Sequence, residues 1–316
     1  GIYKKSRQFD VAEQWALRDV TFKVRSLGKR HPLTMTAHNQ LADIYCCQER
    51  FAEAEKVYQY VLNHRLDTLG QHHPAVAVTC GGLSRLMKAQ QRIGEAIRWR
   101  LWDVRICTHN LGAKHAKTQM AQLYLAELYV LANDHLKAEN VYYSVFRIQQ
   151  ETLGLDHWKT RKTIRDLLGV LKNQGRHRDV LMLRMTLSKE RAILFRSLGK
   201  LEREASELRA LLNLRQYVYG FNHEKTLQVQ NNLAWVLLDL EQEEAFMYFQ
   251  HLQNAWTDPQ DWKSLWVTLG ASLITAMTTG DFTQCVACID ALEQLLGEDH
   301  ERVLKAKERL RRLQSR

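Results

Sequence analysis

The sequence predicts an all-α protein, a solenoid of about seven helical hairpins. Three observations support this fold class. The chain of 316 residues contains only 3 Pro and 15 Gly, too few chain breakers for a protein with many strands. A short motif recurs at a fixed step along the chain. Between its copies, apolar residues follow the spacing of an amphipathic helix rather than the alternation of a strand.

The recurring motif is Leu-Gly-x-x-His, and its step is 42 residues (69 − 27, 111 − 69, 153 − 111). The motif begins at Leu27, Leu69, Leu111 and Leu153. Other positions keep the same step; these series are Ala12, Ala54, Ala96, Ala138 and Val180, and Leu41, Leu83, Leu125 and Leu167. Chance does not readily place several series in one register, so the pattern indicates an internal repeat.

Each repeat is predicted to be a pair of helices. In the first full repeat, Leu41, Ile44 and Tyr45 indicate one helix, and a second apolar stripe starts at Phe51. The Gly of each motif is expected to end a helix in the left-handed conformation. Pro32, four residues after Gly28, suits the first turn of the next helix. The motif His is interpreted as a turn or packing residue rather than a metal ligand.

We expect one continuous array with a regular part, residues 1–174, and an irregular part, residues 175–316. The first repeat is truncated, because residues 1–26 match only a second helix; we therefore expect a fragment of a longer chain. In the irregular part, Gly199 marks a hairpin turn and two further linker motifs start at Tyr219 and Leu296. Residues 301–313 form a charged amphipathic stretch suited to capping the array.

Composition limits the class of protein. Apolar residues make up 45% and charged residues 25%, and no window approaches the roughly 18 apolar residues of a membrane span. No signal-peptide pattern opens the chain. We therefore expect a soluble, intracellular (cytoplasmic) protein without a membrane partner. The six cysteines are interpreted as buried free thiols, and the net charge of +10 favours acidic partners.

No motif for catalysis or for a cofactor stands out. Cys285-x-x-Cys288 has the spacing of half a zinc site, but no second pair supplies further ligands, and its register predicts a packing role. Gly81-Gly82 lacks the Lys-Ser/Thr element of a phosphate loop. The sequence contains no nucleophile elbow. We expect a protein that is not an enzyme and that holds no cofactor or metal.

The residues of the repeat resemble a known family. Leu41-Ala42-x-x-Tyr45, Ala54 and Tyr58 resemble the small-and-large pattern of tetratricopeptide repeats, with eight extra residues that carry the Leu-Gly-x-x-His motif. The longer repeat is similar to those of kinesin light chains, nephrocystin-like proteins and the sensor arrays of STAND-type signalling ATPases. This resemblance implies a right-handed superhelix whose first helices line a groove, and a role in protein binding.

Register and resemblance together name candidate groove residues. The resemblance implies that Asn39, and Asn231 in the irregular part, grip the backbone of an extended peptide. At the step of 42 residues, the remaining candidates are Asp43, Arg85 and Glu127 in one series, Lys88 and Lys172 in another, and Arg165 in the series of Asn39. Gly81 and Leu123 replace the Asn in the middle repeats, so basic charge is expected to replace the clamp there.

Two further groups of side chains have open interpretations. Residues 159–200 hold 12 basic and 3 acidic residues, a balance of 12 − 3 = +9, and form either a solvated face or an anion-binding stretch. Tryptophans on apolar stripes, Trp158 included, are expected in the core, although Trp99 and Trp102 lie in a basic stretch with Arg98, Arg100 and Arg105 that could dock a partner.

These observations favour a protein-interaction module, an adaptor or scaffold, that binds an extended acidic or acidic-aromatic peptide of a partner in its groove. Two alternatives remain open at the level of the sequence: the sensor array of a larger STAND-type signalling ATPase, and a module for self-association. Nucleic acid is disfavoured as a partner, because the basic residues lack a recognised binding fold.

Overall fold

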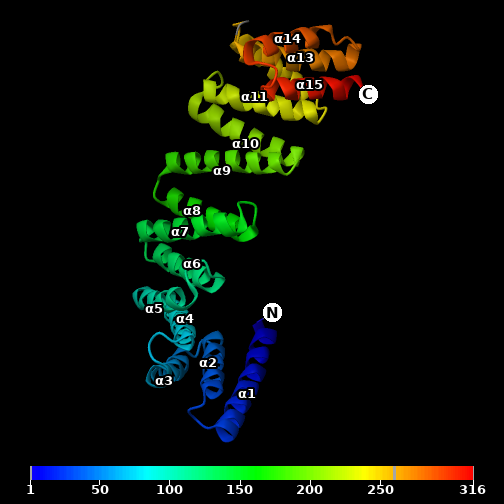
Figure 1. The fold of residues 1–316 in the computed structure, drawn as a ribbon. Coiled ribbons are helices and arrows are strands. Elements are labelled where there is room, and N and C mark those ends of the chain that lie inside the picture. Colours follow the sequence, from blue (N-terminus) through cyan, green and yellow to red (C-terminus); the bar gives the residue numbers. More distant parts are fainter. Residues whose placement is uncertain (1, 259–260, 316) are drawn as a thin grey trace. The chain divides into compact units, whose positions relative to one another are not determined.

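The computed structural model describes the backbone of residues 2–258 and 261–315, and side chains from residue 9 onward within those ranges (Figure 1). All regular elements in these ranges are α-helices, which confirms the all-α prediction.

The helices group into two compact units, Gly1–His177 (unit 1) and Arg178–Arg316 (unit 2). Unit 1 holds α1 (Ile2–Leu27), α2 (Pro32–Cys47), α3 (Phe51–Leu69), α4 (Pro74–Ala89), α5 (Ile93–Leu111), α6 (Ala116–Leu131), α7 (His135–Leu153) and α8 (Trp158–Asn173). Unit 2 holds nearly all of α9 (His177–Ser197), then α10 (Leu201–Tyr219), α11 (Glu224–Asp239), α12 (Glu244–Ala255), α13 (Trp262–Thr279), α14 (Thr283–Leu296) and α15 (Glu301–Gln314).

The helices of unit 1 reproduce the sequence repeat. The first helices α2, α4, α6 and α8 begin 42 residues apart (74 − 32, 116 − 74, 158 − 116), and so do the second helices α3, α5 and α7 (93 − 51, 135 − 93). Each second helix also packs on the first helix that follows it. Every described helix of unit 1 therefore packs on its neighbours in chain order, as expected for a hairpin array.

The motif His has a defined role as a helix cap. In α2, α4, α6 and α8, the preceding His is the N-cap, and its Nδ1 accepts a hydrogen bond of 3.1–3.2 Å from the backbone N–H two residues on. The same cap opens α11 and α15 in unit 2. Because such a bond satisfies one of the donors that a helix N-terminus leaves free, the His fixes where each first helix starts.

The motif Gly does not adopt the left-handed conformation that the sequence predicts, because its ψ angle is extended. Gly70 has φ 80° and ψ 164°, an extended backbone with positive φ that only Gly adopts readily. The turns inside three hairpins of unit 1 hold non-glycine residues with positive φ, at Glu49, Gln91 and Asn133. The linker needs an extended residue because the chain must cross from one hairpin to the next. The turn inside a hairpin must instead reverse the direction of the chain within a few residues.

Small residues allow close packing inside both units. Ala54 is fully buried, and Gly82 of α4 faces the ring of Tyr58, where an added Cβ would lie 2.5 Å from a ring carbon. In unit 2, Gly270 has the same relation to Phe249. These glycines are therefore required by packing, because an aromatic ring of the preceding helix occupies the space of a side chain.

The cysteines are free thiols, but they are not all buried as expected. Cys80, Cys285 and Cys288 are buried, which agrees with a packing role for the last two, whereas Cys47 is exposed. No group of three or more metal-binding side chains is found among the described residues. Within the same part of the chain, none of the helices combines the length and apolar character that a bilayer crossing needs.

Candidate functional site

The inner face is defined here as the face of the first helices that carries the register positions of Asn39, Asp43 and Cys46. Neighbouring first helices contact one another through it. Arg85 of α4 donates from Nη2 to Asp43 Oδ1 of α2 at 2.6 Å, and the Tyr58 hydroxyl donates to the same oxygen at 2.7 Å. Farther along, Lys88 Nζ lies 3.8 Å from Glu127 Oε2 of α6. The inner face of α2, α4 and α6 therefore pairs much of its own charge.

Asn39 is almost fully buried, at 4% exposed. Its Nδ2 lies 3.5 Å from Asp43 Oδ2, while its Oδ1 has no hydrogen-bond partner among the described residues. Asn231 lies on α11 in unit 2 and likewise has a buried Oδ1 without a described partner. A buried amide oxygen that lacks a donor carries an uncompensated desolvation cost.

Arg165 and Lys172 both lie exposed on α8. Neither has an ion pair within the described residues, in contrast to Arg85 and Lys88. The structure thus brings Asp43 and Arg85 together, and Lys88 and Glu127 together, while the cations of α8 face solvent. Basic charge on the inner face of unit 1 is available at its α8 end.

Arg100 of α5, which the sequence groups with Trp99 and Trp102 in a stretch that could dock a partner, is a buried cation. It is only 6% exposed and takes the register of Tyr58 and Tyr142 (100 − 58 and 142 − 100 are both 42). Its Nη1 donates to Asp103 Oδ2 at 2.6 Å, and its Nη2 donates to the Gly81 carbonyl at 3.3 Å. Arg100 is therefore not part of an exposed docking stretch, because the space above Gly81 lets the guanidinium enter the core.

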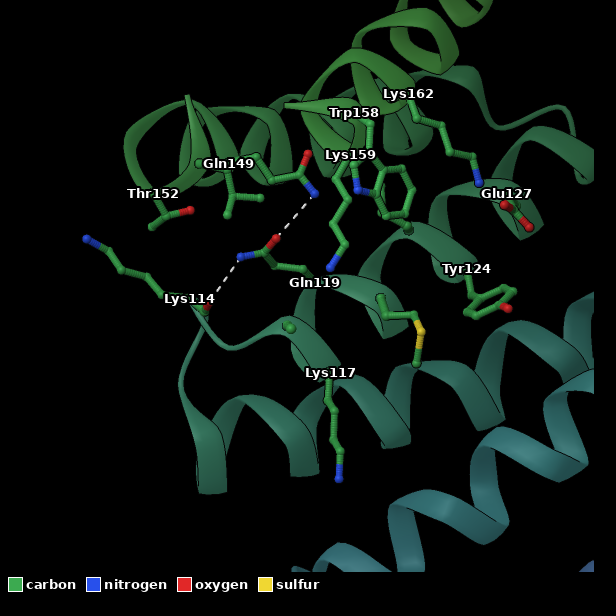
Figure 2. A pocket seen from close by; sticks show the side chains of 14 residues that line it. Lys114, Lys117, Gln119, Tyr124, Glu127, Gln149, Thr152, Trp158, Lys159 and Lys162 are labelled. Carbon is green, nitrogen blue, oxygen red and sulfur yellow. Dashed lines mark hydrogen bonds between the residues drawn. The ribbon is translucent and has the colours of Figure 1, made fainter. Parts of the chain in front are cut away.

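A cleft of about 490 Å³ opens between α6, the end of α7 and the start of α8 (Figure 2). Its apolar wall includes Met120, Leu123, Tyr124, Leu153 and Trp158. Lysines line its edges: Lys114, Lys117, Lys159 and Lys162. Glu127 is the carboxylate among the residues that line it. The cleft combines an apolar wall with a basic edge.

The floor of the cleft is polar and fixed. Gln149 of α7, 1% exposed, donates to Gln119 Oε1 at 3.2 Å, and Gln119 donates to the Lys114 carbonyl at 3.0 Å. Thr163 of α8 donates to Gln149 Oε1 at 2.9 Å. Figure 2 shows the two glutamines joined by a hydrogen bond, to one side of Trp158 and Lys159. This chain of hydrogen bonds ties α6, α7 and α8 together, so the cleft is held in shape before anything binds.

Three of the four lysines at the edge of the cleft have no ion-pair partner among the described residues. Lys114 lies 3.6 Å from Glu151, but no carboxylate lies within 4.0 Å of Lys117, Lys159 or Lys162 in the described part of the chain. Lys159 lies over the Trp158 ring at 5.6 Å. Burial raises the pKa of Asp166 on α8, and the neighbouring Lys162 acts in the opposite direction. The field of the cleft edge is therefore positive, with Lys162 partly offset by Asp166.

Several of these side chains were missed as site residues. Trp158 was expected in the core but is 67% exposed, because it opens α8 at the register of Pro32 and Pro74 and faces the cleft. Lys159 and Lys162 were noticed only as part of the basic stretch. The sequence signal that points to these three residues is their place in the first turns of a first helix, beside the predicted groove positions.

Two-helix hairpins stacked at a constant step, with a cleft on their inner face, define a helical repeat protein. The family model for tetratricopeptide repeats matches residues 23–99, which span α2, α3 and most of the α4–α5 hairpin. Residues 23–99 thus match the tetratricopeptide repeat, as the sequence predicts.

Comparison with solved structures gives matches at low sequence identity and with TM-scores below 0.5. BtubC (BKLC) from P. vanneervenii is 16% identical, with 91% of this chain and 90% of that chain covered and a TM-score of 0.44. A putative kinesin light chain from Podosopora anserina is 18% identical, with coverages of 79% and 99% and a TM-score of 0.41. The TPR2AB domain of yeast Sti1 in its pHSP90 complex is 10% identical, with coverages of 90% and 98% and a TM-score of 0.34. Comparison with the curated proteins found no match.

Proposed function

We propose that this protein is a non-enzymatic interaction module that binds an extended acidic segment of a partner protein along the inner face of unit 1. The cleft between α6 and α8 carries this proposal, because it joins an apolar wall to unpaired lysines. Stacked helical hairpins characteristically use such concave surfaces to bind other proteins.

The chemistry of the cleft defines the segment. Trp158 and Tyr124 offer aromatic surface to an apolar or aromatic side chain, and Lys117, Lys159 and Lys162 offer point charges to flanking carboxylates. Arg165 and Lys172 extend the basic surface along α8. Arg85 and Lys88 contribute less to an acidic ligand than the sequence suggests, since Asp43 and Glu127 already pair with them.

The same proposal uses Asn39 to place the bound chain along the inner face. Its unsatisfied Oδ1 would accept a backbone N–H of an extended peptide on α2, while the acidic part of the peptide lies toward α8. Asn231 would do the same for a segment bound to unit 2.

The test is affinity selection from a peptide library on beads, at low and at moderate salt, with the full chain. Acidic peptides with an aromatic residue should be enriched, and binding should weaken as salt shortens the screening length to about 8–10 Å. Lys159→Glu/Lys162→Glu should abolish the enrichment, and Arg165→Glu/Lys172→Glu should reduce it. Trp158→Ala should weaken binding without lowering the melting temperature, because the side chain is exposed.

A matched control is Lys29→Glu/Lys56→Glu, which changes the net charge equally at two exposed positions away from the cleft. This control should bind as the unmodified protein does. Equal binding by the folded cleft variants, or equal loss in the control, would contradict the proposed site.

A further inference from the structure

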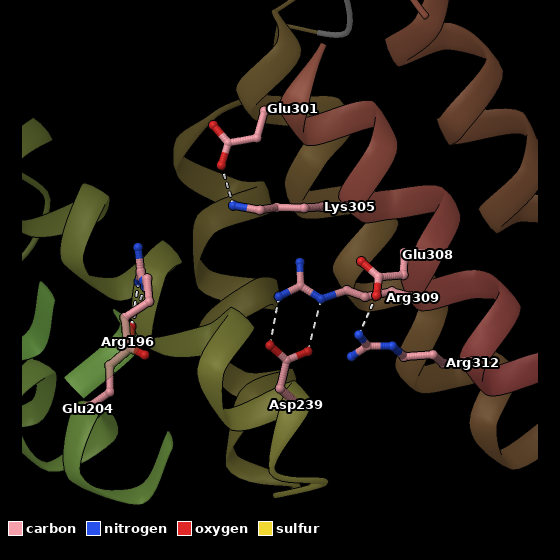
Figure 3. A network of polar contacts seen from close by, with 8 residues as sticks. All are labelled: Arg196, Glu204, Asp239, Glu301, Lys305, Glu308, Arg309 and Arg312. Carbon is pink, nitrogen blue, oxygen red and sulfur yellow. Dashed lines mark hydrogen bonds and ion pairs between the residues drawn. The ribbon is translucent and has the colours of Figure 1, made fainter. Parts of the chain in front are cut away.

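The last helix, α15, lies against the first helices of unit 2 rather than only against its neighbour α14. Arg309 donates to both carboxylate oxygens of Asp239 on α11, from Nε at 2.9 Å and from Nη2 at 2.7 Å (Figure 3). The same guanidinium lies 4.5 Å from the centroid of Trp235. Near the start of α15, Arg302 lies 3.7 Å from the centroid of Trp262 on α13. Two arginines, seven residues apart on one face of α15, therefore each meet an aromatic ring.

This contact spans more than one repeat. In unit 1, the ion pairs between first helices join consecutive ones, as Asp43 of α2 and Arg85 of α4 do. Arg309 instead reaches α11, beyond α13, which is the first helix of the hairpin between them. Trp235 also follows Leu233-Ala234 as Asp43 follows Leu41-Ala42, so it holds an inner-face position. A helix that only capped the last hairpin would not need to reach this position.

Few side chains of α15 are buried. Among those described only Val303 and Ala306 are buried, whereas α12 buries three, α14 four and α11 ten. Eight of the 14 residues are charged, six of them basic. A hollow of about 240 Å³ remains between α15 and the residues Leu238, Asp239 and Leu273. Trp235 Nε1 is buried with no hydrogen-bond partner among the described residues, so α15 leaves this donor unmet. Elements with few buried apolar contacts open at low free energy.

We propose that the inner face of unit 2 at Trp235, Asp239 and Trp262 is a binding surface for a basic amphipathic helix of a partner protein, and that α15 occupies it as an intramolecular ligand. The partner helix carries two arginines two turns apart, as Arg302 and Arg309 are, beside an apolar stripe like that of Val303, Ala306, Leu310 and Leu313. It competes with α15, which is present at a high effective concentration because it is covalently attached. This surface is separate from the acidic-peptide site proposed for unit 1.

The test uses the full chain and a fluorescein-labelled synthetic peptide of residues 300–315 as the probe. The unmodified protein should bind the peptide weakly, because its own α15 fills the surface. Arg302→Glu/Arg309→Glu should loosen α15 and raise peptide affinity at least about 10-fold. The attached helix then no longer competes with the peptide at an effective concentration near the millimolar range. Addition of Asp239→Arg to that variant should reverse the gain in peptide affinity for two reasons. The new positive charge on α11 would pair with a carboxylate introduced on the attached helix, and it would repel the arginines of the peptide.

Hydrogen exchange of the unmodified protein gives an independent readout. Amides of α15 should exchange at least about 100-fold faster than those of α11 and α14, as expected for an element that opens alone. Equal protection of α15, α11 and α14 would show that α15 is an integral cap and would overturn the proposal. Absence of peptide binding to a folded Arg302→Glu/Arg309→Glu variant would overturn it as well.

Discussion

Asp43 and Arg85 occupy the same position of consecutive repeats (85 − 43 = 42), and their side chains meet at 2.6 Å across α2 and α4. Asp43 Oδ1 also accepts a hydrogen bond from Tyr58, so one carboxylate joins α2, α3 and α4. Opposite charges at one register position thus become direct neighbours when the hairpins stack. The inner face is neutralised where the charge alternates in this way and remains basic on α8, where Gly169 takes the register of Asp43 and Arg85.

The first prediction concerns this pair. A double-mutant cycle of Asp43→Asn and Arg85→Gln should give a coupling of less than about 1 kcal/mol, because the two side chains are 39% and 58% exposed and water screens them. Asp43→Asn should cost more than Arg85→Gln, since it also weakens the hydrogen bond from Tyr58. Urea unfolding of the four proteins measures both quantities. A larger loss from Arg85→Gln would disprove the central role given to Asp43.

The second prediction concerns the glycine beneath Tyr58. Gly82→Ala should destabilise the protein by about 1–3 kcal/mol, because the new Cβ would lie 2.5 Å from the ring and must displace it. Gly94→Ala on α5 is the matched control: nothing lies within 4 Å of its added Cβ. Since Ala is the better helix former, the control should be neutral or gain up to about 1 kcal/mol. Thermal unfolding distinguishes the two, and similar melting temperatures would contradict the packing argument.

The third prediction concerns the thiols. Cys47 is exposed, whereas burial raises the pKa of Cys80 to about 12 and that of Cys46 to about 11. Because the thiolate is the reactive form, N-ethylmaleimide at neutral pH should modify Cys47 first, and Cys80 only in denaturant. Peptide mapping by mass spectrometry checks the order. Early modification of Cys80 in the native protein would show that α4 opens more readily than its burial implies.

The fourth prediction concerns pH. Glu13 of α1 accepts hydrogen bonds from Gln48 at 2.8 Å and Arg50 at 2.7 Å, and these lower its pKa. A carboxyl whose pKa is lowered by folding stabilises the folded state above its ordinary pKa, and this contribution is lost as the pH falls through the folded pKa. Glu13→Gln should therefore be less stable than the unmodified protein at pH 7 by under about 1 kcal/mol. Denaturation between pH 7 and about pH 3 should show the difference vanish. A difference that stays constant would mean that the charge of Glu13 is not its source.

Much of the repeat could be predicted because its signals are local. The Leu-Gly-x-x-His motif places a helix end, a linker and the start of the next helix close together, and the structure confirms the helix start at Pro32. The cap role of the motif His was not predicted, since it was interpreted as a turn or packing residue. The role of His31 as a cap uses its own Nδ1 and a backbone N–H two residues away, so no distant contact is needed. Periodic apolar residues then determine which face of each helix is buried.

The character of the candidate site depended on contacts that no local pattern encodes. Arg100 enters the core only because Gly81 on another helix leaves room for it and Asp103 balances its charge, whereas Trp158, an apolar side chain, remains exposed beside a cleft. The sequence by itself determined the fold class, the step of 42 residues and the places where the first helices start. Only the tertiary structure decided which charges are paired, which lysines are free and where α15 lies, because burial and pairing are set by whatever side chains the neighbouring repeats place opposite each residue.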